Sequence, residues 1–156
     1  MNYDNKHRKH DLSPSGAPGD TRENLPGVLG LGRKMTKWLP PNGFTGKVHH
    51  LDAKLGGTYQ MSFTNFTTGK SHSFGGTYLE LKPHERICHT DKFDAPGLPG
   101  EMQTTITLKP VFCGTELNIT QEGVPAAIPV EACYLGWQES LTLLEKLVEA
   151  EIPDEQ

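Results

Sequence analysis

The sequence has no apolar run long enough to span a membrane, and it holds little hydrophobic material for a compact domain. Hydrophobic residues make up 35% of its 156 residues, beside 17 glycines and 12 prolines. A membrane-spanning helix needs roughly 18 or more consecutive apolar residues. The first ten residues, MNYDNKHRKH, also lack the apolar core of a secretory signal peptide. We therefore expect a cytoplasmic protein with one domain and no membrane partner.

Basic charge, cysteine and metal-binding motifs are also scarce. Fifteen basic and 19 acidic side chains give a net charge of −4 with no basic block, so nucleic acid is not an expected partner. Cys88, Cys113 and Cys133 are odd in number and show no CxxC spacing, which favours reduced thiols. His49 and His50 are adjacent, so on a strand they would point to opposite faces. We expect no metal and no other cofactor.

The chain divides into three parts by composition. Residues 1–33 are polar, rich in glycine and proline, and without sustained periodicity. Such a composition predicts a divergent arm that is disordered or loosely attached. Residues 34–152 carry the periodic patterns of a folded domain. Residues 153–156 form an acidic tail.

Residues 128–151 predict one long amphipathic helix. Pro129 suits a first helical turn, where its missing N–H has no helical partner to lose. Apolar residues then recur at three- and four-residue steps, at Cys133, Trp137, Leu141, Leu144 and Val148. An apolar stripe of this width needs a partner surface. Upstream of it, the sequence offers mainly strands.

Six strands are predicted between residue 47 and residue 121. The alternation of Tyr59, Met61 and Phe63 with polar neighbours is typical of a half-buried strand. Gly75 and Gly76 predict a bulge or a sharp bend inside a strand. Residues 34–39 predict one or two helical turns, and residues 110–114 a turn. The predicted strands span residues 47–53, 58–66, 72–81, 86–93, 102–108 and 115–121. Short connections make them an antiparallel meander, so we predict an α+β fold with a curved sheet packed on the terminal helix.

Five short motifs then occur in a familiar order: WLPPNGF (38–44), GGTY (56–59), GGTY (75–78), GTEL (114–117) and GWQESL (136–141). Together they resemble the bacterial SRPBCC proteins of the activator of heat-shock-protein-ninety ATPase homologue type. This group is similar to the START and Bet v superfamily, whose members have a helix-grip fold. The resemblance covers residue 35 to about residue 152. It implies a cavity between sheet and helix, often for an apolar ligand.

The first 33 residues depart from the family, whose members begin with a strand and a helix. DNA that encodes residues 20–32 (DTRENLPGVLGLG) can, one nucleotide later, read TPEKIYRAFLDLD. That peptide resembles the family's first helix. We therefore hypothesise that residues up to about Arg33 are frame-shifted, so that the family's first strand and helix are degraded. The open sheet edge could then pair with a second copy and form a homodimer.

Twelve residues are candidates for lining the cavity that the resemblance implies. They are Trp38, Tyr59, Met61, Phe63, Phe74, Tyr78, His89, Met102, Thr104, Ile106, Trp137 and Leu141. The alternation fits an ordinary filled core equally well, because a pattern cannot separate a cavity from packing. His89 and Asp91 lie two residues apart on one strand face, so they could form a polar pair or a proton relay.

Three functions fit these observations. The leading one is a non-enzymatic domain that binds a small apolar ligand. The second, from the family resemblance, is a co-chaperone module that contacts the heat-shock ATPase. The third is a small enzyme of the cyclase or hydrolase kind that uses His89 or a carboxylate of Glu80, Asp91 or Glu101. The sequence shows no nucleophile elbow and no catalytic triad.

Overall fold

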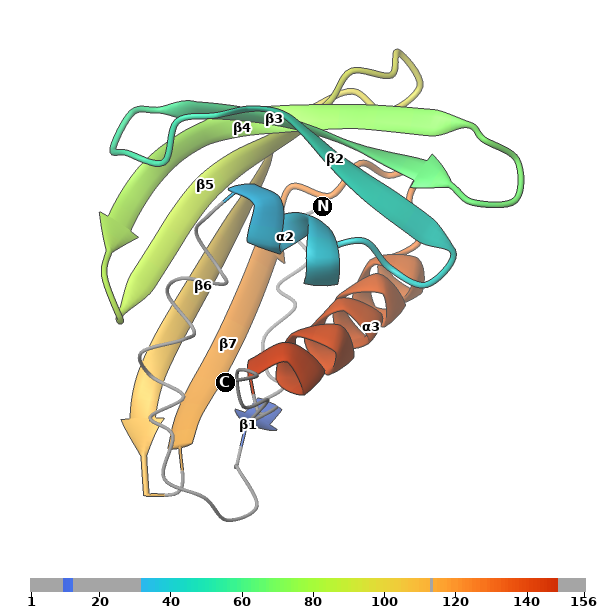
Figure 1. Cartoon of the computed structure of the whole chain (residues 1–156). Coiled ribbons are helices and arrows are strands. Elements are labelled where there is room, and N and C mark those ends of the chain that lie inside the picture. Colours follow the sequence, from blue (N-terminus) through green and yellow to red (C-terminus); the bar gives the residue numbers. More distant parts are fainter. Residues whose placement is uncertain (1–9, 13–31, 113, 149–156) are drawn as a thin grey trace, which may run out of the picture.

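The computed structural model of the chain describes residues 10–12, 32–112 and 114–148 (Figure 1). A curved antiparallel sheet faces the long helix α3, Val130–Val148. The short helix α2, Gly32–Trp38, lies between the sheet and α3 and contacts both β2 and α3. This arrangement confirms the predicted α+β architecture, in which a curved sheet packs on a C-terminal helix.

The sheet contains seven described strands in the order β1-β7-β6-β5-β4-β3-β2. Six of them confirm the predicted meander, with bounds that differ by a few residues. They are β2 Phe44–Leu51, β3 Thr58–Asn65, β4 Ser71–Lys82, β5 Arg86–Phe93, β6 Met102–Val111 and β7 Gly114–Glu122. The seventh, β1, His10–Leu12, pairs with β7 at the edge of the sheet. This strand was not predicted, because three residues are too few to show a period of two.

Two predicted parts of the chain lie largely outside the described residues. The first is the predicted arm, apart from β1 and the start of α2. The second is the end of the predicted terminal helix, together with the acidic tail. At its other end α3 begins at Val130, two residues later than predicted. The carbonyl of Pro129 accepts hydrogen bonds from the N–H groups of Ala132 and Cys133, at 3.0 and 3.2 Å. Pro129 therefore closes the first turn from outside the helix.

The turn predicted at residues 110–114 is wrong in extent, because β6 continues through Pro110 to Val111. The N–H of Leu108 donates to the carbonyl of Glu85 at 2.8 Å, on the side of β5. Successive N–H groups alternate sides along a strand, so the nitrogen of Pro110 faces the same side. The ladder with β5 ends at the pair Arg86–Thr107. The missing N–H of Pro110 therefore costs no hydrogen bond in the sheet.

The strand β4 runs unbroken through Gly75 and Gly76, as predicted. A side chain at Gly75 would clash with the carbonyl oxygen of Tyr59, and one at Gly76 would clash with that of Thr90. Both glycines therefore let the neighbouring strands approach β4 closely. The bulge itself lies a little further along, where the register with β5 shifts between Tyr78 and Glu80.

Buried apolar residues form two clusters under the helices. The first joins α2, the strands β6 and β7, and the C-terminal half of α3; its members are Trp38, Ile106, Leu117, Leu141, Leu144 and Val148. The second joins α2 to β3 and β4 through Met35, Tyr59, Met61 and Tyr78. The two helices are also joined directly. The hydroxyl of Ser140 on α3 donates to the carbonyl of Leu39, the residue after α2, at 2.7 Å. These contacts fix both helices over the concave side of the sheet.

Candidate functional site

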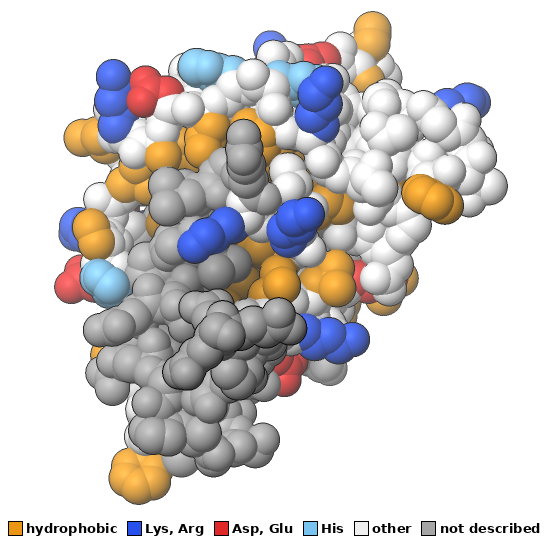
Figure 2. Space-filling view, in the orientation of Figure 1, with side chains coloured by type: hydrophobic (Ala, Val, Ile, Leu, Met, Phe, Trp, Pro, Cys, Tyr) orange, Lys and Arg blue, Asp and Glu red, His pale blue; other side chains and the backbone are white. Residues whose placement is uncertain are grey.

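A cavity of about 290 Å³ lies between the sheet, α2 and the N-terminal half of α3. Its wall is mainly apolar and aromatic, and every element just named contributes side chains to it. In the orientation of Figure 1, the space-filling view shows apolar side chains near the middle of the visible face, beside lysine or arginine side chains (Figure 2). Nine of the twelve predicted lining residues line this cavity: Trp38, Tyr59, Phe63, Phe74, Tyr78, His89, Met102, Ile106 and Trp137.

The other three predicted residues, Met61, Thr104 and Leu141, do not line the cavity. Met61 and Thr104 are completely buried, and Leu141 packs in the cluster with Leu144 and Val148. They share a face with lining residues but lie where neighbouring side chains fill the space. Their place in the periodic pattern sets the direction of each side chain, whereas the packing around it depends on the neighbouring elements.

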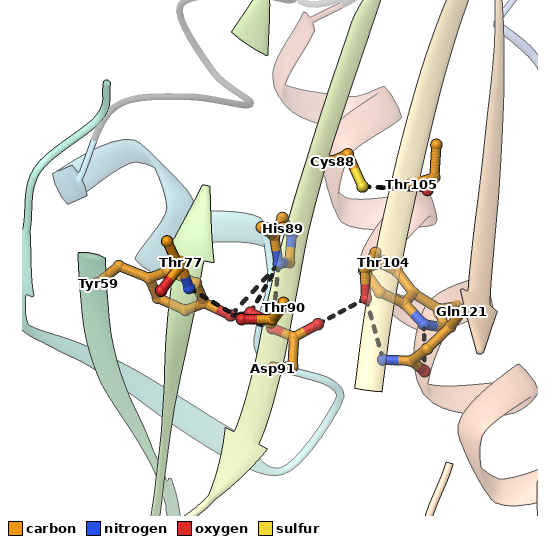
Figure 3. Close-up of polar contacts among 10 residues, drawn as sticks. Tyr59, Thr77, Cys88, His89, Thr90, Asp91, Thr104, Thr105 and Gln121 are labelled. Carbon is orange, nitrogen blue, oxygen red and sulfur yellow. Dashed lines mark hydrogen bonds and ion pairs between the residues drawn. The ribbon is translucent and has the colours of Figure 1, made fainter. Parts of the chain in front are cut away.

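The carboxylate of Asp91 is the centre of a polar network in the cavity wall (Figure 3). The hydroxyl of Tyr59 donates to Asp91 Oδ1 and also lies 3.0 Å from the carbonyl oxygen of Thr90. Nδ1 of His89 lies 3.2 Å from the same Oδ1. The hydroxyl of Thr104 donates to Asp91 Oδ2 at 2.6 Å. Both oxygens of a buried carboxylate are therefore satisfied, as burial of a charge requires.

The network continues from Thr104 to the terminal helix. The side-chain amide of Gln121 donates to the Thr104 hydroxyl at 3.3 Å. The indole N–H of Trp137 donates to the Gln121 carbonyl oxygen at 3.2 Å. A single direction of donation thus runs from α3 through β7 and β6 to Asp91 on β5. This chain of hydrogen bonds fixes the ring of Trp137 against the cavity.

Burial and mutual contact set the charge states in this network. Burial raises the pKa of Asp91, but its hydrogen bonds and the charge of His89 outweigh this, so the pKa lies below its usual value. Burial lowers the pKa of His89, but the contacts with Asp91 outweigh this and leave the pKa raised. Burial, with the nearby Asp91 charge, raises the pKa of Tyr78 to about 12 and that of Tyr59 further. These shifts favour an imidazolium–carboxylate pair, and they keep both tyrosines protonated.

Comparison with known proteins now places the chain. The family model described as "Activator of Hsp90 ATPase homolog 1-like protein" matches residues 32–149. The chain belongs to this AHSA1-like family. The resemblance predicted from the five motifs is therefore confirmed, over nearly the same residues. No protein among those with curated functions matches the chain.

Several solved bacterial structures are similar to this AHSA1-like chain. A Chromobacterium violaceum protein is 48% identical, with a TM-score of 0.83 and 97% of each chain covered. A Nitrosomonas europaea protein is 18% identical, with a TM-score of 0.72 over 96% of this chain and 94% of that one. The AHSA1-like protein of Aeromonas hydrophila is 12% identical, with a TM-score of 0.69 over 96% and 92%. At these low identities the last two show a shared fold only.

The small residues of α3 that form one side of the cavity were not predicted from the sequence. Ala132, Gly136 and Ser140 line it together with Cys133. The first three recur every four residues, which places them on one helical face. That spacing of small side chains is a signal that apolar periodicity overlooks. Other lining residues that were not predicted are Met35, Leu39, Pro41, Ile87, Asp91, Phe93, Gln121 and Ile128.

Of the three carboxylates considered as acids or bases, Asp91 lines this cavity while Glu80 and Glu101 do not. Glu80 pairs with Lys82 at 3.3 Å and with Arg86 at 2.9 Å. The two adjacent histidines contact different side chains. His49 contacts the hydroxyl of Ser62, and His50 contacts the hydroxyl of Thr58.

The described part of the chain contains neither a metal-binding cluster nor a membrane-spanning helix. No group of three or more His, Cys, Asp or Glu side chains in that part could hold a metal ion. None of the helices described is both long and apolar enough to cross a membrane.

Proposed function

We propose that this protein binds one small, mainly apolar molecule in the cavity between the sheet and α3. The observation that carries the proposal is the cavity itself, about 290 Å³ in volume and walled by aromatic and aliphatic side chains. Protein interiors are otherwise packed with few voids larger than a water molecule. Small-molecule pockets usually measure ~300–1,000 Å³, so this cavity lies at the lower end of that range.

The charge states of His89 and Asp91 support binding rather than acid–base catalysis. A general base acting near neutral pH needs a free lone pair and a pKa near 7. Contact with Asp91 raises the pKa of His89, which favours the protonated imidazole, a form without a free lone pair. The oxygens of Asp91 already accept hydrogen bonds from Tyr59, Thr104 and His89. The pair is therefore better suited to hold a ligand than to abstract a proton.

A variant that fills the cavity tests the proposal. Gly136 lines the cavity, and a Cβ added there meets nothing within 4 Å. Gly136→Phe should therefore occupy the ligand volume without disturbing its neighbours. Binding is measured by titration with Nile red, an uncharged apolar dye, and helix content by circular dichroism.

We expect saturable one-to-one dye binding in the parent protein and in the control Gly136→Ala. In Gly136→Phe we expect no binding, with helix content unchanged. Equal dye binding in the parent and in a folded Gly136→Phe variant would show that the dye sits elsewhere, and would refute the proposal.

The family description favours a second candidate, a module that raises the ATPase rate of Hsp90. That function would use the outer surface rather than the cavity. We therefore expect any stimulation of Hsp90 ATP turnover to survive in Gly136→Phe. Stimulation that is lost together with dye binding would instead link both activities to the cavity.

A further inference from the structure

The His89 ring and the Tyr78 hydroxyl, both in the cavity wall, each have a hydrogen-bonding atom without a partner among the described residues. The described residues that contact the His89 ring by hydrogen bonds or as an ion pair, Tyr59, Thr90 and Asp91, all do so through Nδ1. Nε2 is left without a described partner. The ring of Tyr78 packs against Tyr59 and His89, with ring centroids 5.6 and 6.0 Å apart, and no described group accepts its hydroxyl proton. Neither atom is among the fully buried polar atoms of the described residues that lack a partner, so both keep some exposure.

The two groups lie next to each other on adjacent strands. Tyr78 on β4 and His89 on β5 are directly opposite in the register of the sheet, and both line the cavity. Side chains opposite each other on one face of an antiparallel pair have Cβ atoms roughly 5 Å apart. The two donors therefore serve the same part of the cavity.

The contacts in the wall favour the protonated form of both groups. Nδ1 of His89 lies 3.2 Å from Asp91 Oδ1, and this contact raises the imidazole pKa, which favours the form that also carries a proton on Nε2. The Tyr78 hydroxyl also keeps its proton, because burial raises its pKa to about 12. A ligand that displaces solvent from these two donors must accept hydrogen bonds from them, or the donors are left unsatisfied.

The surrounding charges argue against an anionic ligand. The titratable side chains of the described wall are Tyr59, Tyr78, His89, Asp91 and Cys133, and that wall contains no lysine or arginine. Asp91 already balances the charge of His89. A ligand carboxylate would therefore meet the Asp91 charge in a poorly solvated space without a further cation.

We propose that the cavity receives an uncharged apolar molecule with a carbonyl oxygen, which accepts hydrogen bonds from His89 Nε2 and from the Tyr78 hydroxyl. This inference rests on the proposed binding function and narrows it to ketones, aldehydes, esters and related neutral compounds. The hydrocarbon part of the ligand would fill the aromatic side of the cavity. Asp91 would act as a positioning residue that fixes the orientation and charge of His89.

Three probes of nearly equal shape test the proposal: 2-acetylnaphthalene, 2-isopropenylnaphthalene and 2-naphthoate. Their affinities are measured by displacement of Nile red from the parent protein and from Tyr78→Phe, which removes only the hydroxyl. The infrared C=O stretch of ¹³C-labelled ketone reports hydrogen bonding in the bound state. Asp91→Asn serves as a second variant. It removes the carboxylate charge that pairs with His89, and it leaves the donors of Tyr78 and His89 in place.

We expect the ketone to bind more tightly than the hydrocarbon and the carboxylate. The ratio of ketone affinity to hydrocarbon affinity should fall roughly tenfold in Tyr78→Phe, while the hydrocarbon affinity stays unchanged. The C=O stretch of the bound ketone should lie below its frequency in hexane, and should rise in Tyr78→Phe and in Asp91→Asn.

Three results would overturn the inference and leave the binding function intact. The first is a ketone-to-hydrocarbon ratio that is the same in the parent and in Tyr78→Phe, and the second is tightest binding of the carboxylate. The third is failure of all three probes to displace Nile red that has bound in the cavity. Failure of the dye itself to bind would refute the binding function as well.

Discussion

The two halves of helix α3 face the same sheet with different results. The C-terminal half presents Leu141, Leu144 and Val148, which are buried against β6, β7 and Trp38. The N-terminal half presents small residues, such as Ala132 and Gly136, and a cavity remains above them. One half of the helix therefore stabilises the fold, while the other leaves room for a ligand. The difference lies in side-chain volume, since both halves belong to one continuous helix.

Truncation in the packed half should produce the largest effect on stability. Leu144 is completely buried, so Leu144→Ala should lower the free energy of unfolding by ~2–5 kcal/mol through lost transfer energy and a new cavity. The matched change in the other half is Cys133→Ala, at a half-buried position beside existing space. We expect it to cost less than about 1 kcal/mol. Urea unfolding measures both, and equal losses would show that the two halves do not differ as described.

The sequence was sufficient for the fold but not for this difference. The alternation of Tyr59, Met61 and Phe63 predicted the concave face of β3 correctly. Yet Met61 is sealed in the core while Tyr59 and Phe63 line the cavity. Periodicity reports direction, whereas a cavity depends on the summed volume of residues from several elements. Small residues such as Gly136 leave the space open, and the hydrophobic pattern of the sequence does not reveal them.

The polar network shows the same limit. The spacing of His89 and Asp91 predicted their pairing, because residues two apart share a strand face. Their links to Tyr59, Thr104 and Gln121 depend on strand register across the sheet. The printed sequence does not specify that register. Whether residues 1–33 are a frame-shifted arm stays a hypothesis, to be tested by resequencing the gene.

The second prediction concerns the pH dependence of stability near the cavity. The raised pKa of His89 gives a stabilising contribution that is full below its ordinary value of 6.5 and is lost as pH rises through the folded value. The lowered pKa of Asp91 gives a second stabilising contribution. It is present above the ordinary pKa of 3.8 and is lost as the pH falls through the pKa of Asp91 in the folded protein. Both contributions are therefore complete between pH 3.8 and pH 6.5.

The measurement is urea unfolding as a function of pH for the parent and for the double variant His89→Gln, Asp91→Asn. Other titrating groups cancel in the difference between the two free energies. This difference should be largest inside the window and should shrink on the alkaline side as His89 loses its proton. A difference that stays constant from pH 4 to pH 9 would mean that neither pKa differs between the folded and the unfolded protein.

The third prediction is a gain in stability from the cavity half. Gly136 is helical, and its added Cβ would meet nothing within 4 Å. Gly136→Ala should therefore raise the free energy of unfolding by ~0.8–1.0 kcal/mol, the difference in helix propensity. No comparable gain is available by filling space around Leu144, where an added methyl group would overpack the core. A loss of stability in Gly136→Ala would show that the space beside this residue is already filled.

The smallest effect concerns the reactivity of Cys133, which lies in the cavity half of α3. Burial raises the pKa of its thiol above the ordinary 9.0, so alkylation by iodoacetamide should be slower than for the unfolded chain and should accelerate at higher pH than usual. Because the thiol faces the cavity, saturating Nile red should slow the reaction further. Cys88 provides the comparison in a Cys113→Ser background, since it is buried and does not line the cavity. Its slow reaction should not change with dye, whereas equal protection of both thiols would indicate general stabilisation of the fold instead of occupancy beside Cys133.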